Sequence, residues 1–307
     1  MASHDDCLLH VPFPGHPERR ERLAAALAGA AAAGIPPLAV AVDESAVLRA
    51  VELVHEPSLA DRLREACTRA PAVFDSPDNP VSTGTFSAAV AAVACSLAAV
   101  DAAASGSAST VFVAARPPGH HATRNRAMGF CFFNNAAIAA ERFLAAGRGP
   151  VALVDFDVHH GNGSQAHFWE RADVFYLSVH RYPFYPGSGA ASEIGAGKGR
   201  GCTRNFPLAA GATDEVYTAA LAAGLDELLR TVRPGAWVVS AGFDAHREDP
   251  LGGMGVSDDG FFTIGAMLKQ ASPESPLIAV LEGGYNPEAL RRSVRSFLEG
   301  LIGVAIS

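Results

Sequence analysis

The chain has 307 residues, of which 49% are hydrophobic and 18% charged, and this balance excludes an intrinsically disordered protein. Its formal net charge of −8 argues against a nucleic-acid binder that works by neutralising phosphates. A chain of this length can enclose a large core, in one domain or in two smaller ones.

Short apolar runs alternate along the chain with alanine-rich stretches typical of helices. In chain order, the pattern predicts helices at about 20–26 (continuing into the alanine-rich patch 23–34), 44–54, 58–69 and 86–103, a strand at 110–115, a helix at 134–146, strands at 151–156 and 173–179, a helix at 213–231, a strand at 236–241, a helix at 258–270, a strand at 277–282 and a helix at 287–302. The strand candidates are continuously apolar, which is typical of strands covered on both faces. This alternation predicts a parallel, doubly wound α/β sheet.

The longest apolar tract is FSAAVAAVACSLAAV at 86–100. It is rich in alanine, interrupted by serine and shorter than a membrane span. It therefore predicts a buried or half-buried helix, and no membrane partner is expected.

Polar side chains follow four of the predicted strands. They are His120 and His121 after 110–115, then Asp157, His159, His160 and Asn162 after 151–156, Asp244 after 236–241, and Tyr285 after 277–282. In open α/β sheets, ligands bind at the carboxyl ends of the strands. The convergence of four segments on one edge therefore predicts a functional site there.

A metal site is the simplest explanation for the acidic end of the run VALVDFDVHHG. Alternate side chains of an extended segment point the same way, so Asp157 and His159 can reach one point, and Asp244 can complete the set. One histidine and two carboxylates suit a catalytic zinc ion with a fourth position open for water. The alternative is a hydrogen-bonded polar pair at a strand end.

The tandem histidines follow a stiff Pro-Pro-Gly turn. Near a metal they predict a general base and acid, with Asp155 and Asn162 able to hold their second ring nitrogens. Tyr285, after two glycines, could polarise a substrate carbonyl. Each residue alone could equally be an ordinary loop residue.

Together these residues resemble the histone deacetylase family, in particular its class II and bacterial amidohydrolase-like branch. The matching stretches are GHPERRERL (15–23), RPPGHHA (116–122), GFCFFNNAAIAA (129–140), DFDVHHGNG (155–163), SAGFDAHREDPLG (240–252) and LEGGYN (281–286). The resemblance implies the arginase/deacetylase fold: one catalytic domain over residues 1–307, with a mainly parallel eight-stranded sheet flanked by helices.

The resemblance also implies a zinc-dependent deacetylase that hydrolyses an N-acyl amide. One zinc ion per chain is expected at Asp157, His159 and Asp244. The expected catalytic residues are His120, His121 as the more favoured base and acid, Tyr285 at the oxyanion, and Asp155 and Asn162 as orienting groups.

Substrate contacts carry over from the resemblance as well. The expected substrate-binding residues are Gly129, Phe130, Tyr185, Leu251 and Asp78, with Arg22 at the product exit. Tyr185 departs from the family, which usually has phenylalanine there, and a hydrogen bond from its hydroxyl is expected.

Structural K⁺ or Na⁺ ions are a further expectation from the resemblance. The inner site matches Asp155, Asp157, His159, Ser178 and Val179, and the outer site matches Phe168, Arg171, Val174 and Cys202.

Leu251 favours acyl-lysine or another small acyl amide over polyamines, because the polyamine-selective branch tends to carry an acidic residue there. Glu248 or Asp249 could substitute for that missing acid. An acetylpolyamine amidohydrolase is thus the first alternative. A non-catalytic module that binds acylated ligands is the second, and a dinuclear manganese hydrolase of the arginase type is disfavoured because GFDAH lacks a DxD pair.

The five cysteines are scattered and form no CxxC motif, which fits a reducing compartment. The N-terminus shows neither the basic start nor the apolar segment of a signal peptide. We therefore expect a cytoplasmic protein, with no nucleic-acid partner. The stretch before residue 10 is short and polar, so the first strand of the family is expected to be absent or its entry loop rebuilt, which bears on a possible oligomer.

Overall fold

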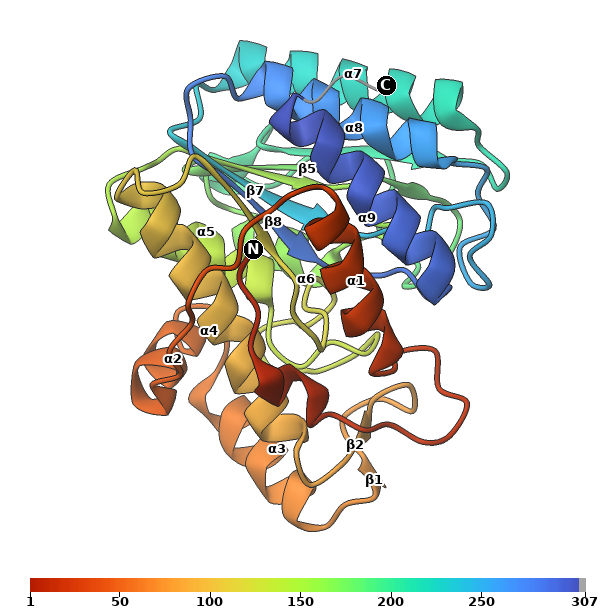
Figure 1. The fold of residues 1–307 in the computed structure, drawn as a ribbon. Coiled ribbons are helices and arrows are strands. Elements are labelled where there is room, and N and C mark those ends of the chain that lie inside the picture. Colours follow the sequence, from red (N-terminus) through yellow and green to blue (C-terminus); the bar gives the residue numbers. More distant parts are fainter. Residues whose placement is uncertain (304–307) are drawn as a thin grey trace.

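Six parallel β-strands form the central sheet of the structure, a computed structural model that describes residues 1–303 (Figure 1). In spatial order the strands are β3 (Thr110–Val113), β8 (Leu277–Leu281), β7 (Ala236–Ala241), β4 (Val151–Asp155), β5 (Val174–Arg181) and β6 (Thr203–Leu208). Strands β4, β7 and β8 are buried at every residue. Their continuous apolar sequences follow from this, since both faces of the sheet are covered.

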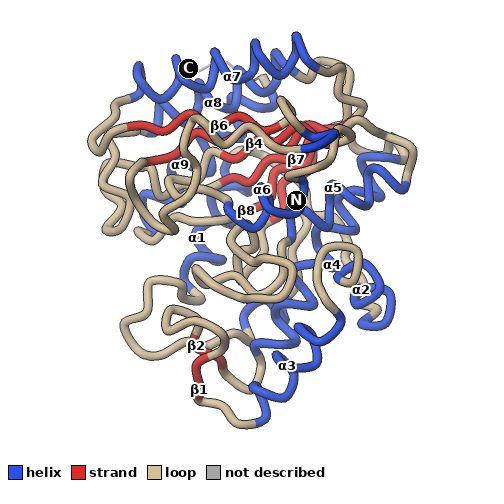
Figure 2. Tube along the Cα trace, turned by 180° about the vertical axis from the view of Figure 1, so that it is seen from behind, coloured by secondary structure: helices blue, strands red, loops and turns tan. Residues whose placement is uncertain are grey.

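Helices form a layer on each face of the sheet (Figures 1 and 2). One layer contains α1 (Glu21–Ala32), α7 (Asp214–Thr231), α8 (Asp258–Ala271) and α9 (Pro287–Ile302). The other contains α4 (Thr85–Ala104), α5 (Asn135–Ala145) and α6 (Asn162–Phe168). The remaining elements are α2 (Glu44–Val51), α3 (Pro57–Thr68), an antiparallel ribbon of β1 (Ala72–Val73) and β2 (Pro80–Val81), and the 3-10 helices η1 (Asp5–Leu8) and η2 (Gly197–Gly199).

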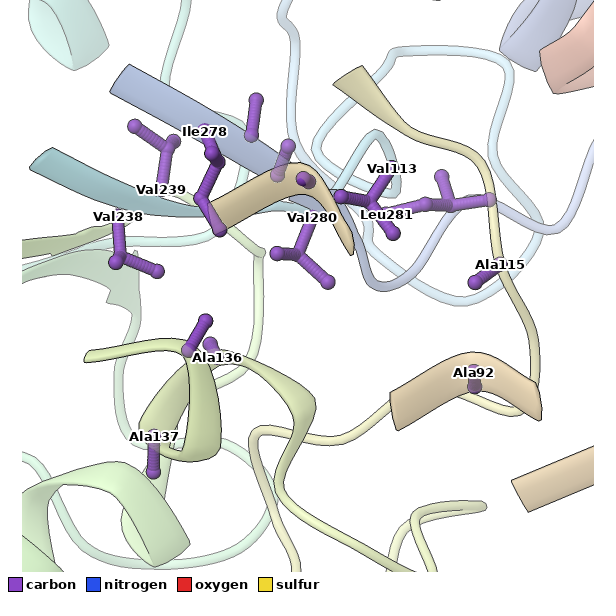
Figure 3. Close-up of a cluster of buried hydrophobic side chains, with 14 of the residues drawn as sticks. Ala92, Val113, Ala115, Ala136, Ala137, Val238, Val239, Ile278, Val280 and Leu281 are labelled. Carbon is purple, nitrogen blue, oxygen red and sulfur yellow. The ribbon is translucent and has the colours of Figure 1, made fainter. Parts of the chain in front are cut away.

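Small side chains bring α4 and α5 close to the sheet. Ala92 of α4 and Ala136 and Ala137 of α5 are fully buried, near the branched side chains of β7 and β8 (Figure 3). By length and composition alone α4 could cross a membrane, but 72% of its apolar window is buried inside the protein. The tract at 86–100 is therefore part of a core helix, as its composition predicts.

The predicted α/β architecture is confirmed, and all five predicted strands are present. The sequence pattern misses β6, β1, β2 and the short helix α6. Strand β6 has the sequence TRNFPL, in which polar residues and a proline interrupt the apolar ones. This composition suits its position at the edge of the sheet, where one side of the strand has no partner.

The expected number of eight strands is wrong, because the central sheet of the described chain has six. At the β3 edge only Ala2 pairs, in parallel with Val113, and η1 begins three residues later. The short N-terminal segment thus replaces a first strand with a single bridge. Strands β1 and β2 form a separate ribbon and do not extend the sheet.

A buried ionic network joins the N-terminal segment to the sheet. Glu18 is bound by Arg116, with atom pairs at 2.8 and 2.5 Å, and by Arg22 at 3.1 Å. Burial on its own would raise the pKa of Glu18, but the charges and hydrogen bonds of its neighbours, Arg116 first among them, together outweigh burial and the pKa falls to about 2. The network fixes the segment that carries Arg22 against the loop that begins at Arg116.

Glu18→Gln is expected to lower the free energy of unfolding by about 3–5 kcal/mol at pH 7, because it leaves two buried guanidinium groups without their carboxylate. Because folding lowers the pKa of Glu18, its contribution is complete above about pH 4.5 and disappears as the pH falls to about 2. Thermal unfolding of both proteins at several pH values tests this: the gap between them should shrink below pH 4.5.

Glu44→Gln is the matched control, since Glu44 pairs with Arg64 at 2.7 Å on the exposed surface. It is expected to cost less than about 1 kcal/mol. A gap between wild type and Glu18→Gln that stays constant from pH 7 to pH 3 would contradict the assigned role of the Glu18 charge.

Candidate active site

The three expected metal ligands follow two neighbouring strands in the middle of the sheet. Asp157 and His159 follow β4, and Asp244 follows β7, which pairs with β4. From β4 the chain proceeds to β5 and β6 on one side, and it later returns to β7 and β8 on the other. This point of reversal is where open α/β sheets bind their ligands.

These three side chains fit a divalent metal ion. Their donor atoms lie within 4.8 Å of one another, and all three residues are buried. His159 Nδ1 is 3.1 Å from Asp157 Oδ1 and 3.1 Å from Asp244 Oδ2. Burial, followed by the negative charge of Asp157, raises the pKa of Asp244 to about 7. Two buried carboxylates at one point need a compensating cation, and the donors suit zinc.

Backbone amides hold the two carboxylates in place. The amide of Gly283 donates to Asp157 Oδ2 at 2.7 Å, and that of Val158 donates to Asp244 Oδ1 at 2.9 Å. A Cβ on Gly283 would lie only 2.0 Å from Asp244 Oδ2. The first glycine of LEGGYN is therefore required because the backbone at this position passes close to the carboxylate of Asp244.

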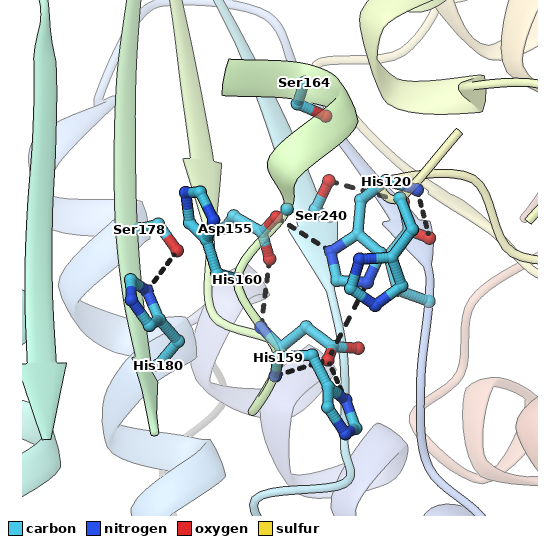
Figure 4. Close-up of polar contacts among 12 residues, drawn as sticks. His120, Asp155, His159, His160, Ser164, Ser178, His180 and Ser240 are labelled. Atoms are coloured by element: carbon cyan, nitrogen blue, oxygen red, sulfur yellow. Dashed lines mark hydrogen bonds and ion pairs between the residues drawn. The ribbon is translucent and has the colours of Figure 1, made fainter. Parts of the chain in front are cut away.

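The tandem histidines lie beside the ligand set, with ring centroids 4.0 Å apart. His120 Nδ1 is 3.0 Å from Asp155 Oδ2 (Figure 4), and His121 Nδ1 is 2.8 Å from Asn162 Oδ1. Burial on its own would lower the pKa of His120, but the charges of Asp155, Asp157 and Glu282 together outweigh it and raise the pKa to about 10. Burial and then the charge of His120 lower the pKa of His121 well below its ordinary value. The two pKa shifts have opposite directions, so the site favours the protonated form of His120 and the neutral form of His121.

His160 does not join the ligand set, although it follows His159 directly (Figure 4). Its Nδ1 is 2.8 Å from Ser188 Oγ, and its Nε2 is 3.0 Å from Gln165 Oε1. The ring of His180 lies 4.8 Å away. These contacts give His160 a structural role between β5 and the loop that follows it.

Tyr285 lines the same cavity as His121 and His159. Burial, although opposed by the charge of Arg22, raises the pKa of the Tyr285 hydroxyl well above its ordinary value. The hydroxyl is therefore a hydrogen-bond donor at neutral pH. The guanidinium of Arg22 lies 4.8 Å from the centroid of the Tyr285 ring and donates to the backbone carbonyl of Gly284 at 2.5 Å.

The cavity has a volume of about 100 Å³, so it admits a narrow ligand. It is lined by Asp78, His121, Gly129, Phe130, His159, Tyr185, Leu251 and Tyr285. Gly129 and Phe130 both have left-handed backbone, with φ of 59° and 67°. A Cβ on Gly129 would lie 2.3 Å from His121 Cδ2, so the glycine lets this wall approach the base.

A hydrogen bond joins two of the residues that line the cavity. The Tyr185 hydroxyl donates to Asp78 Oδ2 at 3.1 Å, and the same oxygen accepts the amide of Gly129 at 3.1 Å. Tyr185 is 37% exposed, which places this contact near solvent. Tyr185 replaces the phenylalanine usual in the family, and the hydrogen bond expected from its hydroxyl is present.

The residues expected to bind monovalent cations lie around β4, α6 and β5. Ser178 is in register with Asp155 and is buried, with Oγ 2.8 Å from His180 Nδ1. The outer group surrounds the turn between α6 and β5: Phe168 ends α6, Val174 begins β5, and the carbonyl of Cys202 accepts the amide of Tyr176 at 2.8 Å.

Two buried carboxylates hold the loops of the site, and the sequence predicts this role for neither of them: Asp249 is expected only as a possible substitute for the acid missing at Leu251. Glu282 accepts the amides of Gly119 and His120 at 2.7 and 3.1 Å, so it anchors the tandem-histidine loop. Asp249 accepts the amide of Tyr285 at 2.6 Å. In the sequence, Glu282 is the last residue of an apolar run and Asp249 lies in a polar loop. The one signal for Glu282 in the sequence is its position, as an acidic residue at the end of a buried apolar run.

The narrow cavity is lined by His159 of the metal-donor set, by His121 as a base and by the hydroxyl donor Tyr285. This arrangement suits hydrolysis of an acyl group at the end of a linear chain. The fold and the site together define a hydrolytic deacetylase domain. Residues 16–301 match the model of the histone deacetylase domain, and the chain belongs to this family.

Relatives that are named for different activities resemble this chain in sequence or in fold. The chain is 46% identical over 193 residues to a probable deacetylase of Methanothermobacter thermautotrophicus, a match that covers 61% of this chain. It is 36% identical to histone deacetylase 15 of Arabidopsis thaliana over 96% of this chain. The crystal structure of acetylpolyamine aminohydrolase from Burkholderia pseudomallei superposes with a TM-score of 0.87 at 33% identity, covering 97% of each chain.

The matched stretch spans 57% of the length of the Methanothermobacter protein and 55% of that of the Arabidopsis protein. The chain therefore spans little more than half the length of these two relatives.

Proposed function

We propose that this protein hydrolyses the N-acyl amide of acylated lysine side chains, with a zinc ion held by Asp157, His159 and Asp244. One observation carries the proposal: the neutral base His121 and the hydroxyl donor Tyr285 line one narrow cavity with the ligand His159. A degenerate binding module would not need this complete set. The bound metal would polarise the amide carbonyl and lower the pKa of water.

The protein groups divide the proton transfers between them. Neutral His121, with Nδ1 bound to Asn162, is free to accept a proton at Nε2 from the attacking water and to return it to the leaving amine. The Tyr285 hydroxyl donates a hydrogen bond to the carbonyl oxygen as negative charge develops there. Burial, and then the charge of His120 beside Asp155, keep the pKa of His121 low.

The acidic neighbours of Leu251 support an acyl-lysine substrate. Asp249 is turned inward, with both carboxylate oxygens bound to backbone amides. Glu248 is paired with Arg292 at 2.9 Å. Neither carboxylate therefore replaces the missing acid at Leu251, and within residues 1–303 neither is free to pair with a second ammonium group of a polyamine there.

Acetylpolyamine hydrolysis is the second candidate function. It is favoured by the superposition with the Burkholderia aminohydrolase, which covers 97% of both chains. The same catalytic groups would serve this reaction, so the two candidates differ in how the cavity mouth recognises the rest of the substrate.

Two further properties belong to the proposal. The buried carboxylate of Asp155 and the hydroxyl of Ser178, in register on β4 and β5, support a structural K⁺ or Na⁺ ion. The five cysteines are free thiols, four of them buried, which supports a cytoplasmic location.

The test compares an acetyl-lysine peptide with N-acetylputrescine and N8-acetylspermidine, using zinc-loaded and chelator-stripped protein. We expect a higher kcat/KM for the peptide and loss of turnover on stripping. A preference for the polyamines would overturn the substrate class but keep the reaction. No turnover of any of the three by zinc-loaded protein would contradict the proposed reaction.

A further inference from the structure

Asp249 joins two loops that meet at the active-site cavity. Its Oδ1 accepts the amides of Leu251 and Gly252 at 2.9 and 3.2 Å, within the loop that follows β7. Its Oδ2 accepts the amide of Tyr285 at 2.6 Å, in the loop that follows β8. Leu251 and Tyr285 both line the cavity, so one carboxylate holds the backbone at two parts of its wall.

Within the described residues, the hydrogen bonds of the Asp249 carboxylate come from backbone amides alone. Asp249 is 8% exposed, and it makes no ion pair within residues 1–303. A buried carboxylate with three backbone amides is held by charge-assisted hydrogen bonds, which are stronger than neutral ones. The three bonds fix the amides of Leu251, Gly252 and Tyr285 relative to one another.

We propose that Asp249 is a positioning residue that fixes the Tyr285 hydroxyl relative to the cavity mouth at Leu251. The inference rests on the proposed function in one respect, namely that Tyr285 donates to the reacting carbonyl. Displacing the Tyr285 amide moves its hydroxyl away from the oxyanion, and a displacement of about 1 Å can reduce the rate about 100-fold.

The geometry explains why an amide could not replace this carboxylate. Asparagine has one acceptor oxygen, and its NH₂ group would face a backbone N–H if it took the place of the second oxygen. Asp249→Asn must therefore release either the Tyr285 amide or the pair formed by Leu251 and Gly252. The change removes a charge but preserves side-chain volume.

The first measurement is hydrogen–deuterium exchange of zinc-loaded wild type and Asp249→Asn, read by mass spectrometry on peptides covering 249–253 and 283–286. Faster exchange in at least one of these two segments, with exchange in the rest of the protein unchanged, supports the role of Asp249 in holding the two loops together. Unchanged exchange in both would overturn it. Glu248→Gln is the matched control, because it removes the neighbouring carboxylate, which is 47% exposed and bound to Arg292.

The second measurement is a double-mutant cycle with Tyr285→Phe. Asp249→Asn alone is expected to lower kcat about 100-fold, with KM little changed and zinc content retained. In the Tyr285→Phe background it should have little further effect on kcat, because no hydroxyl remains to be positioned. A further loss of about 100-fold in that background would overturn the proposal.

The two experiments separate this inference from the proposed function. Absence of turnover by wild type would contradict the proposed function, and the exchange measurement then decides alone whether Asp249 clamps the two loops. Normal turnover in wild type and in Asp249→Asn would overturn the positioning role while the proposed function stands.

Discussion

Asp244→Ala is expected to lose the bound divalent metal and with it nearly all hydrolysis. Alanine removes one of the three buried donors that lie within 4.8 Å of one another. Because a catalytic metal contributes several kcal/mol to stabilising the transition state, kcat/KM should fall by about a thousandfold or more. Metal content by mass spectrometry after zinc loading and desalting checks the cause, and peptide deacetylation checks the consequence.

Asp226→Ala is the matched control, since Asp226 lies on the exposed side of α7. It should keep one zinc ion per chain and wild-type activity. Zinc should also raise the unfolding temperature of wild type and of this control, because binding to the folded state alone stabilises it. An Asp244→Ala protein that still holds one zinc ion and unfolds at a higher temperature with zinc would contradict the ligand assignment.

The sequence predicts those strands whose pattern reflects burial on both faces. Runs such as VALVDF and LIAVLE are apolar because helices cover both sides of the sheet. Strand β6 gives a different signal, since its polar residues and proline reflect an edge. The N-terminal segment forms no strand beside β3: Ala2 bridges to Val113 on one side and to Leu38 on the other before the chain turns into η1.

The candidate site is predictable to the extent that its residues follow strands directly. Asp157, His159 and Asp244 do so, and the switch point of the sheet brings them together. The sequence does not show which residues of distant loops meet, so it predicts a hydrogen bond from Tyr185 without naming its partner. The Tyr185–Asp78 hydrogen bond joins residues 107 positions apart.

The same limit applies to the buried carboxylates that hold the loops. Glu18 and Arg116 are 98 positions apart, and the composition of neither segment indicates that they meet. Residues that touch the reaction can be inferred from chemistry at a strand end. Positioning residues close to a strand end, such as Asp155 and Asn162, can be inferred with them. Positioning residues on distant segments depend on packing, which only the structure defines.

Tyr285→Phe is expected to keep the metal and to lose most of the turnover. The change removes one hydroxyl and leaves the ring, which packs 5.7 Å from Phe130 and 4.8 Å from the Arg22 guanidinium. Loss of one oxyanion donor costs about 10²–10³ in kcat. Because the hydroxyl acts mainly as the carbonyl oxygen becomes negative, kcat should fall far more than KM rises. Steady-state kinetics and zinc content of the purified variant measure both.

Tyr182→Phe provides the comparison, because Tyr182 lies in the loop after β5 and outside the cavity lining. It should retain wild-type kcat. Burial raises the pKa of the Tyr285 hydroxyl well above its ordinary value. A phenol that stays protonated can donate at every pH at which His121 is neutral, so loss of activity in Tyr285→Phe should not depend on pH across the neutral range. Full activity in that variant, with metal bound, would assign oxyanion stabilisation to the metal alone and remove Tyr285 from the mechanism.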